Sequence, residues 1–293
     1  MTPHKFSQLA ALTLVLVLGG LSSARAQMAF ASAEQAADAL LQAIGNNDDA
    51  ALARVLGKDW KQLMPPDGID AEERQRFMDK ARQSRAVNVK DGRGELVIGT
   101  DPWTLPIPLA QGKDGQWRFD PRGGRAAVRE RIIGANELSA MQAMLAYIDA
   151  QREYAQADRN GDGMLEYAQK FISSPGQRDG LIWSAKLGDE SPIGEAFAPT
   201  KPSEGYHGYH FRILTAQGPQ AAGGERSYLI GKRLSSGFAL LAWPVSYGKS
   251  GIMSFKVNQD GKVFERDLGP ATSAEAAAIK RFDPDGEWAP VKP

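Results

Sequence analysis

The feature that most constrains the fold is a long stretch without proline in the middle of the chain. From about Arg125 to Asp158 the sequence has one glycine, Gly134, and its apolar residues recur at helical spacing. The recurring residues are Ile132, Ile133, Leu138, Met141, Leu145 and Ile148. A helix of this length spans about 50 Å at 1.5 Å per residue, which is longer than a typical domain core. We therefore expect one continuous helix that joins two modules.

The residues before this helix predict helices followed by antiparallel strands. Helical patterns run through "SAEQAADALLQAIGNND", "DDAALARVLG" and "DAEERQRFMDKARQS". Strand-like runs, "RAVNVK" and "GELVIG", flank the turn "DGRG", and a second pair, "WTLPIPLA" and "QWRFD", flanks "QGKDG". Pro106 and Pro108 favour an edge or irregular strand in the second pair. This order of elements predicts an α+β module and is similar to the cystatin-like fold, a sheet curled around a helix.

The residues after the long helix predict strands and turns. "GYHGYHFRILTA" alternates in part, and "RSYLIGKRLSSGFALLAWPVSYG" gives two runs around a Gly/Ser turn. "GIMSFKVNQDGKVFERDLG" is typical of a hairpin around "NQDG", and the tail predicts one short helix. We expect a signal peptide at 1–26, an α+β module at 27–124, and the long helix with an antiparallel sheet at 125–293.

The N-terminus is typical of a secretory signal. Lys5 supplies a positive charge, "LAALTLVLVLGGL" the apolar segment, and "ARA" a small-residue cleavage site. The apolar run is short for a membrane anchor. We expect cleavage after Ala26, a mature protein that begins at Gln27, no stable membrane insertion after cleavage, and a periplasmic or secreted location.

Composition narrows the classes of function. Lysine plus arginine equals aspartate plus glutamate, at 35 each, so no basic field exists to attract nucleic acid. The chain has no cysteine, which excludes disulfides and thiol catalysis. No G-x-S-x-G elbow, phosphate-binding loop or dinucleotide fingerprint occurs. Aromatic residues gather late in the chain, where they favour a core, although such residues also bind glycans and partner proteins.

The segment "DRNGDGMLEY", residues 158–167, is the candidate metal site. In an EF-hand-type loop, oxygen ligands occupy positions 1, 3, 5, 7, 9 and 12, with glycine at position 6. Counting from Asp158, the candidate ligands are Asp158, Asn160, Asp162, the carbonyl of Met164, and Glu166. Position 12 is Gln169, which cannot give a bidentate carboxylate. The spacing favours a structural calcium ion, and the alternative is a solvated turn that ends the long helix.

Several stretches resemble a family of exported bacterial proteins known as a domain of unknown function. They are "YAQADRNGDGMLEYAQKFISSPGQRDGLIW", "YHGYHFRIL" and "GFALLAWPVSYGKSGIMSFKVNQDGKVFERDLGP". The resemblance covers most of the chain after residue 26. The resemblance implies that the protein is exported, and it implies no activity because the family has none assigned.

A second resemblance concerns residues 126–269, in which a long helix precedes a sheet that closes with "WPVSYGKSGIMSFKVNQDGKV". This order is similar to the headpiece of type IV pilin-like and pseudopilin proteins, and it implies a pilin-like C-terminal module. Those proteins polymerise through a strongly apolar N-terminal helix. Here the helix carries many charged residues and follows another module, so the resemblance concerns the fold and not filament assembly.

These observations favour an exported, soluble, non-catalytic binding or assembly factor of the cell envelope, with an envelope protein or a glycan as its partner. The alternative is a periplasmic hydrolase that uses carboxylates at the junction of the two modules. Two carboxylates with pKa values pushed apart at that junction would favour the hydrolase. A shallow, neutral, aromatic surface would favour binding.

Overall fold

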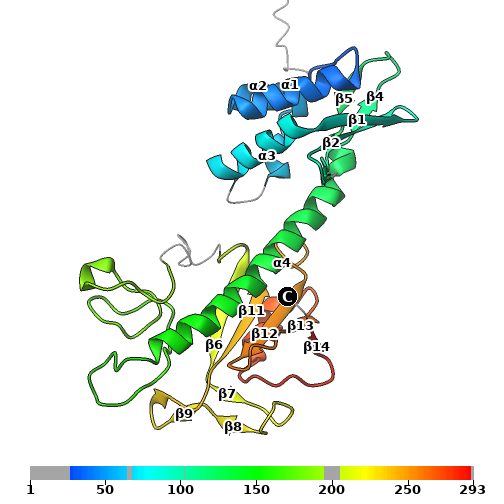
Figure 1. Ribbon diagram of the computed structural model, residues 1–293. Coiled ribbons are helices and arrows are strands. Elements are labelled where there is room, and N and C mark those ends of the chain that lie inside the picture. Colours follow the sequence, from blue (N-terminus) through cyan, green and yellow to red (C-terminus); the bar gives the residue numbers. More distant parts are fainter. Residues whose placement is uncertain (1–26, 65–67, 102, 195–204, 292–293) are drawn as a thin grey trace, which may run out of the picture.

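The computed structural model describes residues 27–64, 68–101, 103–194 and 205–291 of the 293-residue chain. The expected signal peptide at 1–26 lies outside these residues. Figure 1 shows two bodies at the two ends of one long helix, α4. Each body has its own hydrophobic core, one built from residues between Phe30 and Val128 and the other from residues between Ala140 and Trp288.

The N-terminal body packs short helices against an antiparallel sheet. Its helices are α1 (Ala33–Gly45), α2 (Asp49–Leu56), the 3-10 helix η1 (Trp60–Leu63) and α3 (Ala71–Gln83). Local capping explains where two of them begin. The Ser32 side chain accepts a hydrogen bond from the Gln35 N–H at the start of α1. At the start of α3, Asp70 and Glu73 form a capping box, in which each side chain accepts from the backbone of the other.

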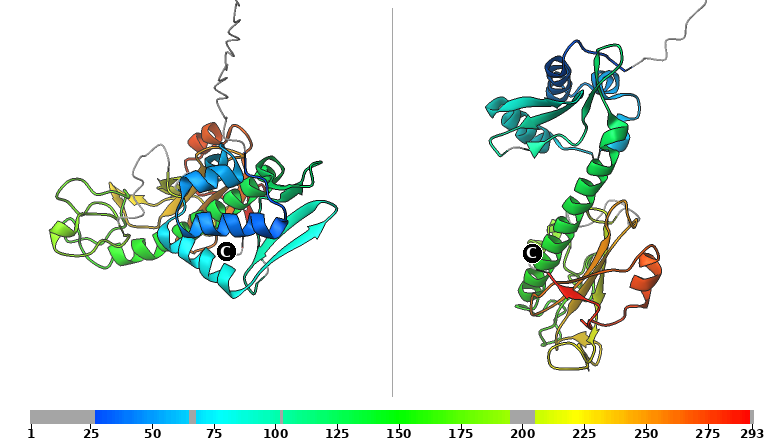
Figure 2. Two further views of the ribbon diagram at one scale, coloured as in Figure 1. Left: turned by 90° about the horizontal axis from the view of Figure 1, so that it is seen from above. Right: turned by 90° about the vertical axis from the view of Figure 1, so that its right-hand side faces the viewer.

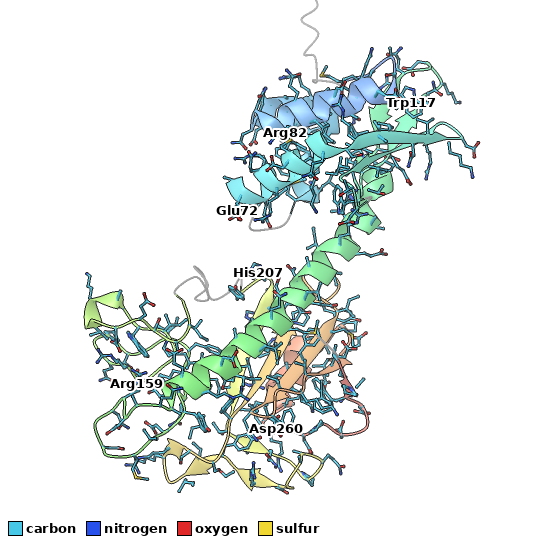
Figure 3. The ribbon with its side chains drawn as sticks, viewed as in Figure 1. Glu72, Arg82, Trp117, Arg159, His207 and Asp260 are labelled. Atoms are coloured by element: carbon cyan, nitrogen blue, oxygen red, sulfur yellow. The ribbon has the colours of Figure 1, made fainter. Side chains whose placement is uncertain are left out.

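The sheet of this body has the order β1-β2-β4-β5, with β3 also pairing with β2. Its strands are β1 (Arg85–Lys90), β2 (Arg93–Ile98), β3 (Trp103–Thr104), β4 (Leu109–Gln111) and β5 (Trp117–Phe119). Trp117, at the start of β5 and labelled in Figure 3, is buried and belongs to the core of this body. "WTLPIPLA" does not form one strand, because Pro106 and Pro108 cannot donate to a ladder, and the pairing resumes at Leu109.

Helix α4 spans Pro121–Tyr154, 34 residues, and so starts and ends four residues earlier than the sequence predicts. Pro121 stands at its first turn, and the Asp120 side chain accepts from the Gly123 N–H at 2.9 Å. Val128 joins the N-terminal core, whereas the buried residues from Ala140 onward join the C-terminal core. The helix therefore belongs to both bodies and changes its buried partner along its length.

The C-terminal body is built on an antiparallel sheet of order β14-β13-β12-β11-β6. Its strands are β6 (Tyr209–Leu214), β11 (Ala239–Pro244), β12 (Met253–Asn258), β13 (Phe264–Asp267) and β14 (Ala289–Pro290). Helix α4 covers one face, and α5 (Thr272–Ala278) lies on the other (Figure 2). Because both faces are covered, β11 and β12 are buried along almost their whole length.

Shorter elements extend this body. They are the 3-10 helix η2 (Ala185–Leu187) and the strand pairs β7 (Ala216–Gln217) with β8 (Arg226–Ser227), and β9 (Leu229–Ile230) with β10 (Arg233–Leu234). The predicted α+β class, with antiparallel sheets and a long connecting helix, is confirmed. Among the described residues, no helix combines the length and apolar character needed to cross a membrane.

Candidate functional site

The loop that follows α4 folds around the carboxylate of Asp158. The backbone N–H groups of Gly161, Asp162 and Gly163 donate to Asp158 at 2.8, 3.3 and 2.7 Å. Both glycines have positive φ, 74° and 83°, which lets the backbone curl back on the side chain. These N–H donors lower the pKa of Asp158, with the bond from Gly163 contributing most. Asp158 is therefore held as a carboxylate.

The remaining predicted side-chain ligands share one hydrogen-bond network. The side-chain amide of Asn160 donates to Asp162 at 3.3 Å and to Glu166 at 2.8 Å. Desolvation raises the pKa of Glu166, and the charge of Asp162 raises it further. The N–H of Met164 donates to Asp162 at 3.0 Å, while the Met164 side chain is exposed. The loop thus brings the predicted side-chain ligands close to one another.

A positive group already faces this loop. Arg233, from β10, donates from Nε and Nη2 to one oxygen of Asp162 at 2.8 and 2.5 Å. Within the described residues, no group of three or more histidine, aspartate or glutamate side chains is arranged to hold a metal ion. The calcium site stays a prediction, and an ion bound here would compete with Arg233 for Asp162.

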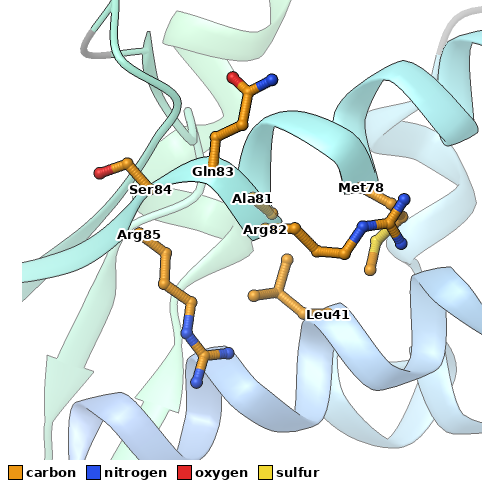
Figure 4. Close-up of a pocket in the computed structure, with 7 residues that line it drawn as sticks. All are labelled: Leu41, Met78, Ala81, Arg82, Gln83, Ser84 and Arg85. Atoms are coloured by element: carbon orange, nitrogen blue, oxygen red, sulfur yellow. The ribbon is translucent and has the colours of Figure 1, made fainter.

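Two surface hollows lie away from this loop, and no pattern in the sequence predicts either of them. The first, of about 480 Å³, lies between α1 and the junction of α3 with β1 (Figure 4). Leu41, Met78 and Ala81 form its apolar floor, and Arg82 and Arg85 stand at its rim. The hollow is open to solvent, so it is suited to a side chain of a partner and not to enclosing a substrate.

The second hollow, of about 600 Å³, lies in the irregular lobe between α4 and β6. Its lining is mainly apolar and includes Ser174, whose hydroxyl donates to Asp179 at 2.9 Å. Lys170 donates to Ser174 at 2.9 Å and pairs with Asp179. Desolvation opposes ionisation of Asp179, but the hydrogen bonds from Lys170 and Ser174 outweigh it and lower the pKa to about 2. Because Lys170 and Asp179 bind each other and Ser174, neither is free to act as a base for a serine nucleophile, so this cluster holds the loop in place.

Glu137 in α4 and Glu265 in β13 are the carboxylates that matter for the alternative prediction, a hydrolase with its site at the junction of the two modules. Glu137 accepts hydrogen bonds from the backbone N–H groups of Ile252 and Met253, at 2.9 and 3.0 Å. Desolvation raises the pKa of Glu265, and the charge of Glu137 adds to this rise. The hydrogen bonds to Glu137 hold α4 against the start of β12, so the role of Glu137 is structural. The two hollows described above do not adjoin this pair.

Comparison with known proteins places the chain in a family without assigning it an activity. No curated protein matches the sequence. No solved structure matches either, so the cystatin-like and pilin-like resemblances stay predictions. Residues 27–291 match the family described as protein of unknown function (DUF2950). The matched range covers every residue of the candidate loop and both hollows, and the chain belongs to the DUF2950 family.

Proposed function

We propose that this protein is an exported, non-catalytic binding or assembly factor of the bacterial cell envelope. The observation that carries the proposal is the arrangement of two cored bodies on one continuous helix of 34 residues. Such a helix holds two surfaces at a set separation, which suits a protein that brings partners together. The open form of both hollows supports contact with a macromolecule, an envelope protein or a glycan.

The chemistry of the charged clusters supports binding over hydrolysis. One oxygen of Glu137, Oε1, accepts from two backbone N–H groups, and Lys170 is paired with Asp179. A general acid or base must be within hydrogen-bond reach of its substrate, and neither cluster offers a free group beside an enclosed cavity. A structural calcium ion in the loop of residues 158–166 is part of the proposal. So is a pilin-like C-terminal module, which is supported by a helix packed across an antiparallel sheet.

The experiment is affinity capture from the envelope fraction with the full secreted chain as bait, in calcium and in chelator. The matched variant carries a four-residue Gly/Ser insertion after Gly134, which leaves both cores intact and uncouples the two bodies. We expect one envelope component to be retained by the wild type and to be lost, at least in part, from the insertion variant. The proposal would be contradicted if the wild type retained no component beyond a mock bait. It would also be contradicted if the wild type turned over envelope material and Glu137→Gln abolished that turnover.

A further inference from the structure

The outer edge of the N-terminal sheet is a strand with one partner. Among the described strands, β1 pairs with β2 alone. The two-residue turn Asp91–Gly92 joins them, with φ of 50° and 72°. In a hairpin of this kind the pair that flanks the turn exchanges both backbone hydrogen bonds, and bonded pairs then alternate along the ladder. The residues of β1 whose backbone groups bond to β2 are therefore Lys90, Asn88 and Ala86. The hydrogen bond from the Gly99 N–H to the Ser84 carbonyl, at 2.9 Å, continues the same alternation.

The backbone groups of the intervening residues, Arg85, Val87 and Val89, consequently point away from β2. None of the described residues forms a hydrogen bond to the N–H or carbonyl of these three. Five of the six residues of β1 are exposed, and Val89 is 50% exposed. The edge thus presents alternating donors and acceptors to solvent, the arrangement to which an additional strand pairs.

The hollow in Figure 4 lies at the start of this edge. Ser84 and Arg85 line it, and its floor is apolar, with Leu41 and Ala81 each 5% exposed. Arg85 pairs with Asp38 of α1, so its side chain lies on the face of the sheet that the helices cover. A strand added beside β1 would direct alternate side chains to that same face. One apolar side chain of such a strand would therefore meet the floor of the hollow.

The charges along the edge select the partner. β1 carries Arg85 and Lys90 and no acidic residue, and Arg82 stands at the rim of the hollow. Arg82 and Arg85 pair with Asp79 and Asp38, but solvent-exposed pairs of this kind are weak, and each guanidinium keeps further donors. Pairing of β1 with β1 of a second copy would bring basic strands together, which opposes a homodimer through this edge.

We propose that β1 is the docking edge for an extended acidic segment of a partner protein, which adds to the sheet as a strand and places an apolar side chain in the hollow between α1 and α3. Main-chain bonds to Arg85, Val87 and Val89 supply the pairing, and acidic side chains meet Arg82 and Arg85. This inference rests on the proposed function as a binding factor and names the chemistry of one partner.

The test uses the full secreted chain and a fluorescein-labelled octapeptide, Val-Val-Glu-Glu repeated twice, in which each face of the extended strand carries both valine and glutamate. The octapeptide with lysine in place of each glutamate is the matched control. We expect the acidic peptide to bind at least tenfold more tightly in fluorescence anisotropy. Amide hydrogen exchange should slow at Val87 and Val89 when it binds. The amides of Ala86 and Asn88 should change less, because they already bond to β2.

Two variants separate main-chain pairing from charge. Val89→Pro removes an outward N–H without touching the ladder to β2, whereas Val89→Ala keeps that N–H and removes only the side chain. We expect Val89→Pro to weaken binding of the acidic peptide at least tenfold and Val89→Ala to weaken it less than threefold. Arg85→Glu should reverse the preference between the acidic and basic peptides. Unchanged melting temperatures would show that the variants fold.

The inference would be overturned if the two peptides bound equally, or if proline and alanine at position 89 had equal effects on binding. It would also be overturned if the wild type formed a dimer in which the amides of β1 are protected from hydrogen exchange and lose that protection on dilution. If the envelope component captured by the wild type is also captured by Val89→Pro, the docking edge is wrong while the proposed function stands. If no component is captured by any variant, the proposed function itself fails.

Discussion

At the residue scale, Lys256 is the least expected group in the C-terminal core. It lies in the middle of β12, its residue is 2% exposed, and its Nζ donates to the carbonyl of Asp283 and lies 3.9 Å from the centroid of the Trp288 ring. Desolvation lowers its pKa to about 7, although the charges of Asp285 and Asp283 act in the opposite direction. The Lys256 side chain therefore holds the segment of Asp283 and Trp288 against the sheet. Its burial there also weakens its affinity for a proton.

The pKa of Lys256 makes stability depend on pH. Between pH about 7 and about 10.5 the unfolded chain binds this proton and the folded chain does not, so the free energy of unfolding rises with pH across that window. The rise is at most about 1.4 kcal/mol per pH unit. Lys256→Met should be more stable than the wild type at pH 6. Its free energy of unfolding should lack the rise with pH that Lys256 causes in the wild type. Urea denaturation at several pH values measures it.

The control for this prediction is Lys249→Met, which removes an exposed lysine of the same sheet region. It should keep the wild-type slope. A slope in Lys256→Met that equals the wild-type slope would show that Lys256 stays protonated in the folded protein throughout the window.

A second prediction at this scale concerns the loop of residues 158–166. The loop lacks the bidentate acid of EF-hand loops, so calcium should bind with a dissociation constant on the order of 10⁻⁴ to 10⁻³ M. Calcium at about 100-fold over that constant would stabilise the fold by about 2.7 kcal/mol. Arg233→Gln should tighten binding, because the guanidinium no longer competes for Asp162. Asp162→Ala should abolish the calcium-dependent rise in melting temperature.

Differential scanning fluorimetry in chelator, calcium and magnesium measures these shifts. Magnesium should substitute poorly, because it demands tight octahedral coordination. Without metal, Asp162→Ala should change the melting temperature little, because the ion pair that it removes, with Arg233, is partly exposed to solvent. Identical wild-type curves in chelator and in calcium would identify "DRNGDGMLEY" as a turn that ends the helix.

At the scale of elements, much of the fold follows from local patterns in the sequence. Apolar periodicity and Ser32 predict α1, and "DGRG" predicts the hairpin of β1 and β2. The irregular lobe after α4 has no such periodicity and depends on contacts such as Arg178 with Asp189. The partner of Asp162 could not be predicted, because Arg233 lies 71 residues away and meets it through tertiary structure alone.

Two glycines of α4 should respond oppositely to the same substitution. A Cβ at Gly124 would lie 2.3 Å from the carbonyl oxygen of Pro106, whereas a Cβ at Gly134 meets no atom within 4 Å. Gly134→Ala should therefore stabilise the protein by about 0.5–1 kcal/mol, the gain in helix propensity. Gly124→Ala should destabilise it by about 1–3 kcal/mol, the typical cost of overpacking. Urea denaturation of both variants measures this, and equal signs would contradict the packing of residues 106–108 on the start of α4.

At the scale of the whole molecule, one continuous helix, α4, holds the two bodies at a set separation. The stretch of α4 between the two cores carries no proline, and its only glycine there is Gly134. Glu137 and Asn136 tie it to the C-terminal body through Ile252 and Ser250. Arg131 ties it to the N-terminal body through the Thr104 carbonyl at 2.5 Å. Contacts at both ends of this stretch therefore oppose bending between the bodies.

The most direct test is a distance distribution between spin labels placed one in each body. The chain has no cysteine, so Glu72→Cys and Glu225→Cys, at side chains 81% and 61% exposed, can be labelled without further changes. A rigid α4 should give a single narrow distribution that broadens strongly when four Gly/Ser residues are inserted after Gly134. A distribution that is already broad in the uninserted chain, and that the insertion does not change, would contradict it.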